Sequence, residues 1–401
     1  MLAQFRVGNY LSFKHNPFFY MRACKDKEHP EAVAELGANG RLLKACVVIG
    51  ANASGKSNFI NAMRFMVNYV LNSHLKQLNQ VTGRTAFKFD PETLGMPSTF
   101  EVVFVQGRVK YEYGFALNDT EVTDEYLYHY PHGRKALIFE RSHINKYRFT
   151  TDVDLQSNLK DRNTANKLYL STAANWNYEK VIPVFKWFSS WKFIDQSIFG
   201  QASEESAEKL RDGEYRNKIS KMMKAVDSSI SSLQLTEGRT GFGGTLTGVY
   251  DHIEVVHHVV AEDGKENVYT LNMAEESRGT RAYFDLIGLV YNTLDSGGIL
   301  VADDMDAHFH PLLTRKIVAL FNSDQHNPRN AQLIFTTKNT NLLGLSLLRR
   351  DQVWFSEKWD PESITDVYPL IEYSVRKDMS LEKCYLQGRF GGVPQFPNEM
   401  L

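Results

Sequence analysis

The run Gly50-Ala51-Asn52-Ala53-Ser54-Gly55-Lys56-Ser57 combines glycines, a lysine and a serine at the spacing of a phosphate-binding loop. In such a loop the backbone N–H groups surround phosphate oxygens, the lysine adds a positive charge and the serine hydroxyl ligates magnesium. A glycine turn that only joins a strand to a helix is the alternative interpretation. The pattern predicts a triphosphate and Mg²⁺ site whose binding residues are Gly50, Asn52, Ala53, Ser54, Gly55, Lys56, Ser57 and Asn58.

Two carboxylates follow the apolar run Ile299–Ala302. They are expected at the carboxyl end of a buried strand, the edge of an α/β sheet where ligands collect. Asp303 is therefore predicted as a second magnesium ligand beside Ser57, and Asp304 as the residue that orients an attacking water. His308 and His310 offer a His-x-His zinc alternative, but the sequence shows no third ligand nearby.

A third motif, Glu276-Ser277-Arg278-Gly279-Thr280, precedes the apolar helical segment Phe284–Leu294. A Ser-x-Gly turn that opens a helix presents free N–H groups to an anion, so Ser277 and Gly279 are candidate phosphate contacts. An ordinary helix cap made by Ser277 is the alternative.

The elements around these motifs alternate strand and helix. Lys44–Ile49 reads as a buried strand, and apolar residues recur at helical spacing from Ser57 onward. Further strands are predicted at Ile299–Ala302, Leu333–Thr336 and Val353–Phe355, with a helix at Pro311–Phe321. The two outer thirds of the chain are therefore expected to form one split α/β domain.

The middle of the chain has other patterns. Between about 99 and 149 apolar residues alternate with polar or small ones, which predicts an antiparallel sheet. The stretch 165–235 is more helical and precedes the glycine-rich loop Gly238–Gly248. One aromatic cluster in this stretch is interpreted as core rather than as a partner surface; its members are Tyr178, Phe185, Trp187, Phe188 and Trp191.

Composition is that of an ordinary globular protein. The 401 residues are 43% hydrophobic and 23% charged, with three unpaired-looking cysteines and no long apolar run, so a cytoplasmic protein without a membrane segment is expected. The net charge of −1 gives no general attraction to nucleic acid. DNA contact would need a local basic groove, for which the candidates are Arg6, Lys14, Arg84, Lys88, Arg108 and Lys110.

These motifs carry a family resemblance. The sequence resembles the ABC-type ATPases grouped with the SMC, RecF and OLD proteins, and more closely the abortive-infection ATPases of the RloA and AbiL kind. The resemblance covers most of the chain and is weakest between about 150 and 250. The matching segments are Phe5–Phe13, Gly50–Asn58, Glu276–Thr280, Gln332–Leu343, Arg349–Gln352 and Tyr385–Gly391.

The resemblance implies an α/β fold: an ABC-type P-loop ATPase head with an antiparallel β lobe and an inserted, mainly helical subdomain. Residues 1–150 would form the N-terminal part of the head, 151–248 the insertion and 249–401 the C-terminal part. It also implies hydrolysis of ATP with Mg²⁺ in a homodimer, where Ser277 and Gly279 of one subunit contact the γ-phosphate in the other. Relatives of this kind act in anti-phage defence through a separate effector, commonly a TOPRIM or HNH nuclease.

Three positions depart from the family pattern: Leu11 where an arginine is usual, Asp304 in place of the catalytic glutamate, and Lys338 in place of the switch histidine. Asp304 and Lys338 remain the candidate catalytic residues, with slow turnover expected because aspartate is one methylene shorter. Two alternatives stay open: a sensor that binds ATP but scarcely hydrolyses it, and a DNA repair or maintenance ATPase. A guanine site is excluded, since Thr340 has no carboxylate to pair with guanine.

Overall fold

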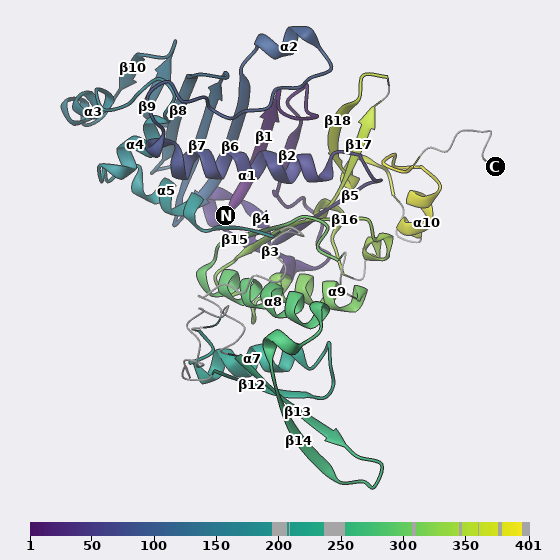
Figure 1. Ribbon diagram of the computed structural model, residues 1–401. Coiled ribbons are helices and arrows are strands. Elements are labelled where there is room, and N and C mark those ends of the chain that lie inside the picture. Colours follow the sequence, from purple (N-terminus) through teal and green to yellow (C-terminus); the bar gives the residue numbers. More distant parts are fainter. Residues whose placement is uncertain are drawn as a thin grey trace.

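The computed structural model describes residues 1–194, 207, 209–235, 253–306, 310–344, 347–359, 361–375 and 379–394. The glycine-rich loop Gly238–Gly248 and His308 lie outside the described residues. Figure 1 shows an antiparallel sheet in the upper part of the molecule, a second sheet in the middle, helices α8 and α9 beneath it, and a hairpin that projects at the bottom.

The central sheet has the strand order β11-β15-β16-β5-β17-β18. Neighbouring strands from β11 to β17 run parallel, and β18 is antiparallel to β17. Strand β5 comes from the N-terminal third and lies between two strands from the C-terminal third, so both ends of the chain build one sheet. The strands are β5 Ala45–Ile49, β11 Trp191–Ile194, β15 Ile299–Ala302, β16 Gln332–Thr337, β17 Val353–Trp359 and β18 Ile364–Pro369.

Both faces of this sheet are covered, which explains why its strands are almost continuously apolar. In β5, Cys46 and Val48 face the core that includes α1, whereas Val47 and Ile49 face the core that includes α8. The predicted helices after the phosphate loop, after the Ser-x-Gly motif and at Pro311 are confirmed. The helices on the two faces are α1 Lys56–Asn72, α8 Arg278–Ser296, α9 Pro311–Asn322 and α10 Leu381–Leu386.

A seven-stranded antiparallel sheet packs on the other side of α1, as the period-two pattern predicted. In β7, for example, Tyr113 is fully buried while its neighbour Glu112 is partly exposed. Helix α1 lies across these strands in Figure 1. The sheet contains β1 Leu2–Gly8, β2 Phe18–Tyr20, β6 Ser98–Gln106, β7 Val109–Leu117, β8 Val122–Tyr130, β9 Ala136–Ser142 and β10 Lys146–Phe149; the short elements β3 Val33–Glu35, β4 Arg41–Leu43 and α2 Pro91–Gly95 adjoin it.

The middle of the chain contributes helices α3 Val153–Lys160, α4 Tyr169–Asn175, α5 Ile182–Ser189 and α7 Gly213–Met223. Its aromatic cluster belongs to the core, as predicted: Trp187 stacks on Phe104 of the antiparallel sheet with ring centroids 3.8 Å apart. Two parts of the helical expectation were wrong, because Trp191–Ile194 forms strand β11 at the edge of the central sheet and Ile230–Leu235 forms strand β12. In β11, pairing with β15 outweighed the helical spacing of its aromatic residues.

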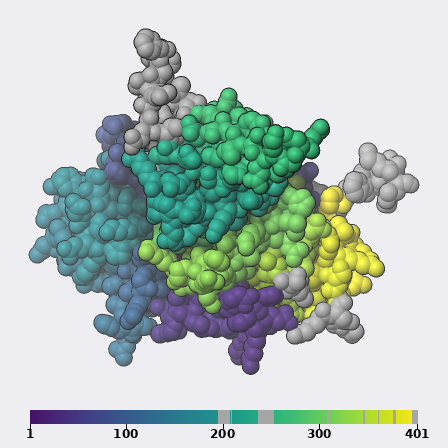
Figure 2. Space-filling model, turned by 90° about the horizontal axis from the view of Figure 1, so that it is seen from below, coloured from purple at the N-terminus to yellow at the C-terminus, as the bar shows by residue number. Residues whose placement is uncertain are grey.

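A third sheet has the order β12-β13-β14, with β12 Ile230–Leu235, β13 Ile253–Val260 and β14 Glu266–Asn272. Helix α7 covers its base, and the β13–β14 hairpin projects from the body in Figure 1. Seen from below, the teal and green residues of this lobe stand in front of the light-green residues that follow them in sequence (Figure 2). A short 3-10 helix, Met273–Glu275, connects β14 to the Ser-x-Gly motif, which opens α8.

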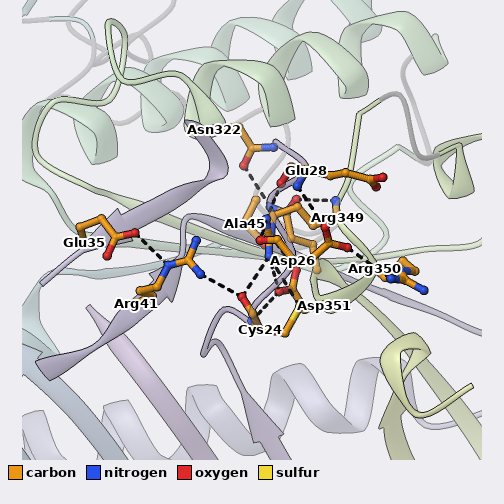
Figure 3. A network of polar contacts seen from close by, with 11 residues as sticks. Cys24, Asp26, Glu28, Glu35, Arg41, Ala45, Asn322, Arg349, Arg350 and Asp351 are labelled. Carbon is orange, nitrogen blue, oxygen red and sulfur yellow. Dashed lines mark hydrogen bonds and ion pairs between the residues drawn. The ribbon is translucent and has the colours of Figure 1, made fainter. Parts of the chain in front are cut away.

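A buried polar network ties the N-terminal segment to the entry of β17 (Figure 3). The Arg349 guanidinium donates to both carboxylate oxygens of Asp351, at 2.9 and 2.8 Å, and to the carbonyl oxygen of Asp26 at 3.1 Å. The Asp351 carboxylate in turn accepts from the backbone N–H of Cys24 at 2.8 Å. The Arg349–Gln352 segment therefore has a structural role, and it fixes β17 beside β5 and the phosphate loop.

The six basic residues that were candidates for a DNA-binding groove are mostly neutralised by neighbouring carboxylates. Four of the six candidate residues pair with carboxylates: Arg6 with Glu101, Lys14 with Asp90, Arg84 with Asp119 and Lys110 with Glu112. Within the described parts of the chain, no helix is both long and apolar enough to cross a membrane.

Candidate functional site

The phosphate loop connects β5 to α1 in a strained, closely packed turn. Gly55 has φ 103°, and a Cβ there would come within 2.2 Å of the Thr365 hydroxyl, so only glycine fits this position. Ala53 also has a positive φ, of 63°. The carbonyl oxygen of Ser54 accepts hydrogen bonds from Ser356 at 2.9 Å and from Thr365 at 3.2 Å. Strands β17 and β18 thus hold the loop in shape from outside.

Lys56 is buried at the first position of α1. Its ammonium donates to the carbonyl oxygens of Gly50 at 2.8 Å and Ala51 at 2.7 Å, so it is held against the loop. Burial lowers the pKa of Lys56, and the carboxylates of Asp304 and Asp303 oppose this effect only in part. A bound polyanion would favour the charged form of this lysine, because an adjacent opposite charge raises the pKa of an amine.

A cavity of about 320 Å³ opens over the loop and α1. Three lysines and one carboxylate supply its charged groups, so it favours a polyanion. The cavity brings together most of the residues predicted from the sequence, from three separate segments of the chain, and adds Ser12 and Lys358 from two more. Its lining consists of Ser12, Asn52, Ala53, Gly55, Lys56, Ser57, Asn58, Asp304, Lys338 and Lys358.

The two aspartates after β15 are both held by one hydroxyl of β16, Asp303 through its carboxylate and Asp304 through its backbone N–H. Thr336 donates to the Asp303 carboxylate at 2.6 Å and accepts from the backbone N–H of Asp304 at 2.8 Å. Asp304 has φ 45°, an uncommon left-handed conformation for a residue other than glycine. Its carboxylate reaches the Lys338 ammonium at 3.0 Å. Lys338 therefore meets Asp304 in the cavity.

Ser57 and Asp303 are the predicted magnesium ligands, and of the two only Ser57 is among the residues that line the cavity. The Ser57 side chain lines the cavity, and Asp303 lies close enough to influence the charge of Lys56. A hydroxyl and a carboxylate oxygen are the hard ligands that Mg²⁺ takes when it is bound mainly through phosphate and water. The donor set thus fits this ion. Of the two histidines in the zinc alternative, His310 caps α9 and His308 lies outside the described residues; the described residues include no cluster of three or more metal-ligating side chains.

Ser12 joins the N-terminal turn to the loop. Its hydroxyl accepts from Asn58 at 2.8 Å and from Thr365 at 2.8 Å, which places it at the cavity wall. The preceding turn contains two positive φ values, at Asn9 and Leu11. Leu11, where the resemblance led us to expect an arginine, packs against the hydrophobic core.

The Ser-x-Gly motif does not line this cavity. Ser277 caps α8, its hydroxyl accepting from the Thr280 N–H at 3.1 Å, and residues 277–279 are exposed. Across the described residues, no hydrogen bond joins them to the phosphate loop. The preceding residue, Glu276, is held by His257 of β13 at 2.8 Å, with both side chains nearly buried. The motif is therefore an exposed helix start that is not hydrogen-bonded to the phosphate loop of its own chain in the described residues.

Sequence reasoning missed Ser12, Thr336, Thr365 and Lys358. Lys358 had a usable signal: it lies at the carboxyl end of the predicted strand that begins at Val353, where side chains of parallel strands meet a ligand. The two threonines and Ser12 had none. Thr365 contacts the loop at Ser54, Ser12 contacts Asn58 and Thr336 contacts both aspartates, each from a position far away in sequence. No local pattern marks a hydroxyl that accepts or donates one particular hydrogen bond.

Comparison with known proteins agrees with the loop chemistry. Residues 46–344 match the family model described as "AAA domain, putative AbiEii toxin, Type IV TA system". A search of curated proteins gives no match. The matched segment includes the phosphate loop, the Ser-x-Gly motif, both aspartates and Lys338. It ends before Lys358 and the C-terminal residues that pack beside the loop.

Proposed function

Because the chain belongs to the AAA-domain family of AbiEii-type P-loop ATPases, we propose that its ATP-bound dimer controls a separate effector protein. The observation that carries this proposal is the lysine-lined cavity over the phosphate loop, whose charge and donors suit a magnesium-bound triphosphate. When bound, Mg²⁺ would neutralise phosphate charge. The chain's own residues then hold the phosphates, with Ser57 and Asp303 as the metal's protein ligands.

Hydrolysis is proposed to be slow. We propose the Asp304 carboxylate as the group that orients the attacking water, and this carboxylate is paired with the Lys338 ammonium. The Lys338 ammonium thus occupies the carboxylate that would otherwise accept a hydrogen bond from the attacking water. The lysine keeps a positive charge near the γ-phosphate, which supports tight binding of ATP more than rapid turnover.

Dimerisation is proposed from the exposure of Ser277 and Gly279. These residues present the N-terminus of α8, a 19-residue helix, to solvent. A helix N-terminus attracts phosphate through its free N–H groups and its dipole. Since the motif makes no contact with its own loop among the described residues, a second copy is the molecule whose ATP it would cover. Two such contacts related by twofold symmetry give two composite sites.

The effector and its setting are proposed from family resemblance. Similar ATPases of the RloA and AbiL kind work with a second protein in anti-phage defence, and a TOPRIM or HNH nuclease is the effector we propose here, in the cytoplasm. A sensor that holds ATP and scarcely hydrolyses it is the second candidate, favoured by the Asp304–Lys338 pair. A DNA repair role has less support, because most of the candidate basic residues are paired with carboxylates.

Mixing two inactive variants tests the composite site. Lys56→Ala damages the phosphate loop, and Ser277→Arg blocks the motif that covers it. Each variant alone should lack ATP turnover, whereas a heterodimer has one complete site. An equimolar mixture should therefore recover roughly a quarter of wild-type turnover if subunits exchange freely in a twofold dimer. A mixture that stays as inactive as its components, beside an active wild type, would refute composite sites.

A further inference from the structure

A second cavity, of about 370 Å³, adjoins the first on the outer side of the phosphate loop. It is built by three segments: loop residues Ala51–Ser54, the end of β17 at Glu357–Trp359, and the C-terminal Gly392–Pro394. Asn52, Ala53 and Lys358 line both cavities. Whatever occupies the second cavity therefore lies next to the phosphates in the first.

The walls of this cavity are held in place by contacts with the loop and with β18. The carbonyl oxygen of Gly392 accepts from the Ala51 N–H at 2.8 Å, which fixes the C-terminal segment to the phosphate loop. The Glu357 carboxylate accepts from the Tyr368 hydroxyl at 2.8 Å. The cavity is thus a formed feature of the fold, with one carboxylate at a defined place.

Trp359 forms an exposed wall of the cavity. Its side chain is 52% exposed, unlike Trp187, Trp191 and Trp354, which are buried. An exposed tryptophan beside a carboxylate suits a flat cation, which stacks on the indole while it pairs with the carboxylate. Tryptophan is also among the residues that contribute most to protein interfaces.

Arg278 is a cation placed to reach such a site from a second molecule. It lies between Ser277 and Gly279, the two residues proposed to cover the first cavity, and it is exposed on the first turn of α8. No ion pair of Arg278 occurs among the described residues. When Ser277 and Gly279 approach Asn52 and Ala53 of another copy, Arg278 is carried to the cavity that shares those two residues.

We propose that, in the ATP-bound dimer, Arg278 of the partner subunit enters this second cavity, stacks on Trp359 and pairs with Glu357. The inference rests on the proposed composite site and adds to it a contact that recognises the partner protein. Arginine is enriched at interfaces for this kind of bidentate and stacking contact. Each dimer would contain two such contacts, one beside each ATP.

Charge reversal tests the pair. Arg278→Glu and Glu357→Arg should each weaken ATP-dependent dimerisation by about tenfold or more, because each places like charges together. The double variant, with both charges exchanged, should recover most of the lost affinity. Arg134→Glu, a reversal at an exposed arginine in the β8–β9 turn, is the control and should leave dimerisation unchanged. Sedimentation velocity with Mg²⁺ and ATP gives the dimer dissociation constant for each protein.

Removal of the indole gives an independent test. Trp359→Ala should also weaken the dimer, whereas Trp176→Ala, at a tryptophan 50% exposed elsewhere, should not. If Trp359→Ala instead reduced ATP affinity in dilute monomer, the cavity would hold the nucleotide base and the proposal would be wrong. If the wild type dimerises with ATP and none of Arg278→Glu, Glu357→Arg and Trp359→Ala weakens that dimer, this inference alone would be overturned. A wild type that stays monomeric with ATP would overturn the composite site as well.

Discussion

The Lys338 ammonium lies 3.0 Å from the Asp304 carboxylate, and both side chains line the cavity over the phosphate loop. The lysine side chain is 53% exposed, so the ion pair adds little to stability. We propose that the pair acts on hydrolysis instead, because Lys338 occupies the carboxylate that we propose to orient water. The two positions at which the resemblance led us to expect a glutamate and a histidine, Asp304 and Lys338, therefore contact each other.

Exchange of both residues should accelerate turnover. The Asp304→Glu, Lys338→His variant has a longer carboxylate and an imidazole in place of the ammonium. We expect its ATP hydrolysis rate to exceed that of the wild type by about tenfold or more, since small changes in the position of a catalytic group alter rates by this order. Phosphate release at saturating ATP measures it.

Lys338→Gln separates the loss of the Asp304–Lys338 ion pair from the gain of a histidine, because it removes the ion pair without supplying an imidazole. A smaller increase than in the double variant is expected. A wild type that already hydrolyses ATP as fast as the double variant would show that the pair does not limit turnover, and it would exclude the slow sensor.

Loss of the Asp303 carboxylate should raise the Mg²⁺ concentration that ATP hydrolysis needs. The Asp303→Asn variant keeps the hydrogen bond capacity toward Thr336 but loses the negative charge of the metal ligand. We expect the Mg²⁺ concentration for half-maximal ATP hydrolysis to rise by about tenfold or more, the order that loss of a ligand-shell contact costs. Asp306→Asn, at a carboxylate held by Thr337 at 2.7 Å, is the matched control. Equal magnesium dependence in both variants would contradict the assignment of Asp303.

ATP affinity should fall as pH rises through the alkaline range. Burial lowers the pKa of Lys56, so in the free protein this lysine loses its proton at a lower pH than an ordinary lysine. Bound phosphates favour the charged form, and above the lowered pKa binding must therefore take up a proton. Titration with a fluorescent ATP analogue at several pH values measures the fall.

Lys56→Arg provides the comparison, because a guanidinium stays protonated throughout that range. Its affinity should change less with alkaline pH than that of the wild type. The same pH dependence in both proteins would mean that another group takes up the proton.

Stability should depend strongly on Arg349. Its side chain is fully buried and pairs with Asp351, itself 1% exposed (Figure 3). Arg349→Met leaves a buried carboxylate without its partner, which costs about 3–5 kcal/mol of unfolding free energy. Arg350→Met removes a pair at 3.3 Å that is about one-third exposed on the arginine side, and should cost about 1 kcal/mol or less. Urea unfolding measures the free energy of unfolding of both variants. If Arg349→Met lost no more stability than Arg350→Met, the buried Arg349–Asp351 pair would not have the structural role assigned to it.

The sequence predicted the parts of the site that are local. The loop Gly50–Ser57 and the Asp303–Asp304 pair each lie between elements whose apolar periodicity is clear, so their positions at strand ends followed from pattern alone. The helix that opens at Ser277 was predicted for the same reason. These features need only the order of residues along one strand or one helix.

Other parts arise from contacts between distant segments. Ser12 and Thr365 meet at 2.8 Å although 353 residues separate them. Strand β11 formed where helical spacing was expected, since pairing with β15 depends on a partner more than 100 residues away. Neither contact can be predicted from local periodicity, because each depends on a partner segment that is distant in the sequence.

The mass of the protein in solution with and without ATP tests the central claim most directly. With Mg²⁺ and ATP, sedimentation should show a dimer that is lost in Lys56→Ala and in the absence of nucleotide. A protein that stays monomeric at saturating ATP, or a Lys56→Ala variant that dimerises with ATP as the wild type does, would contradict the claim that the loop of one subunit and Ser277 of another enclose the nucleotide.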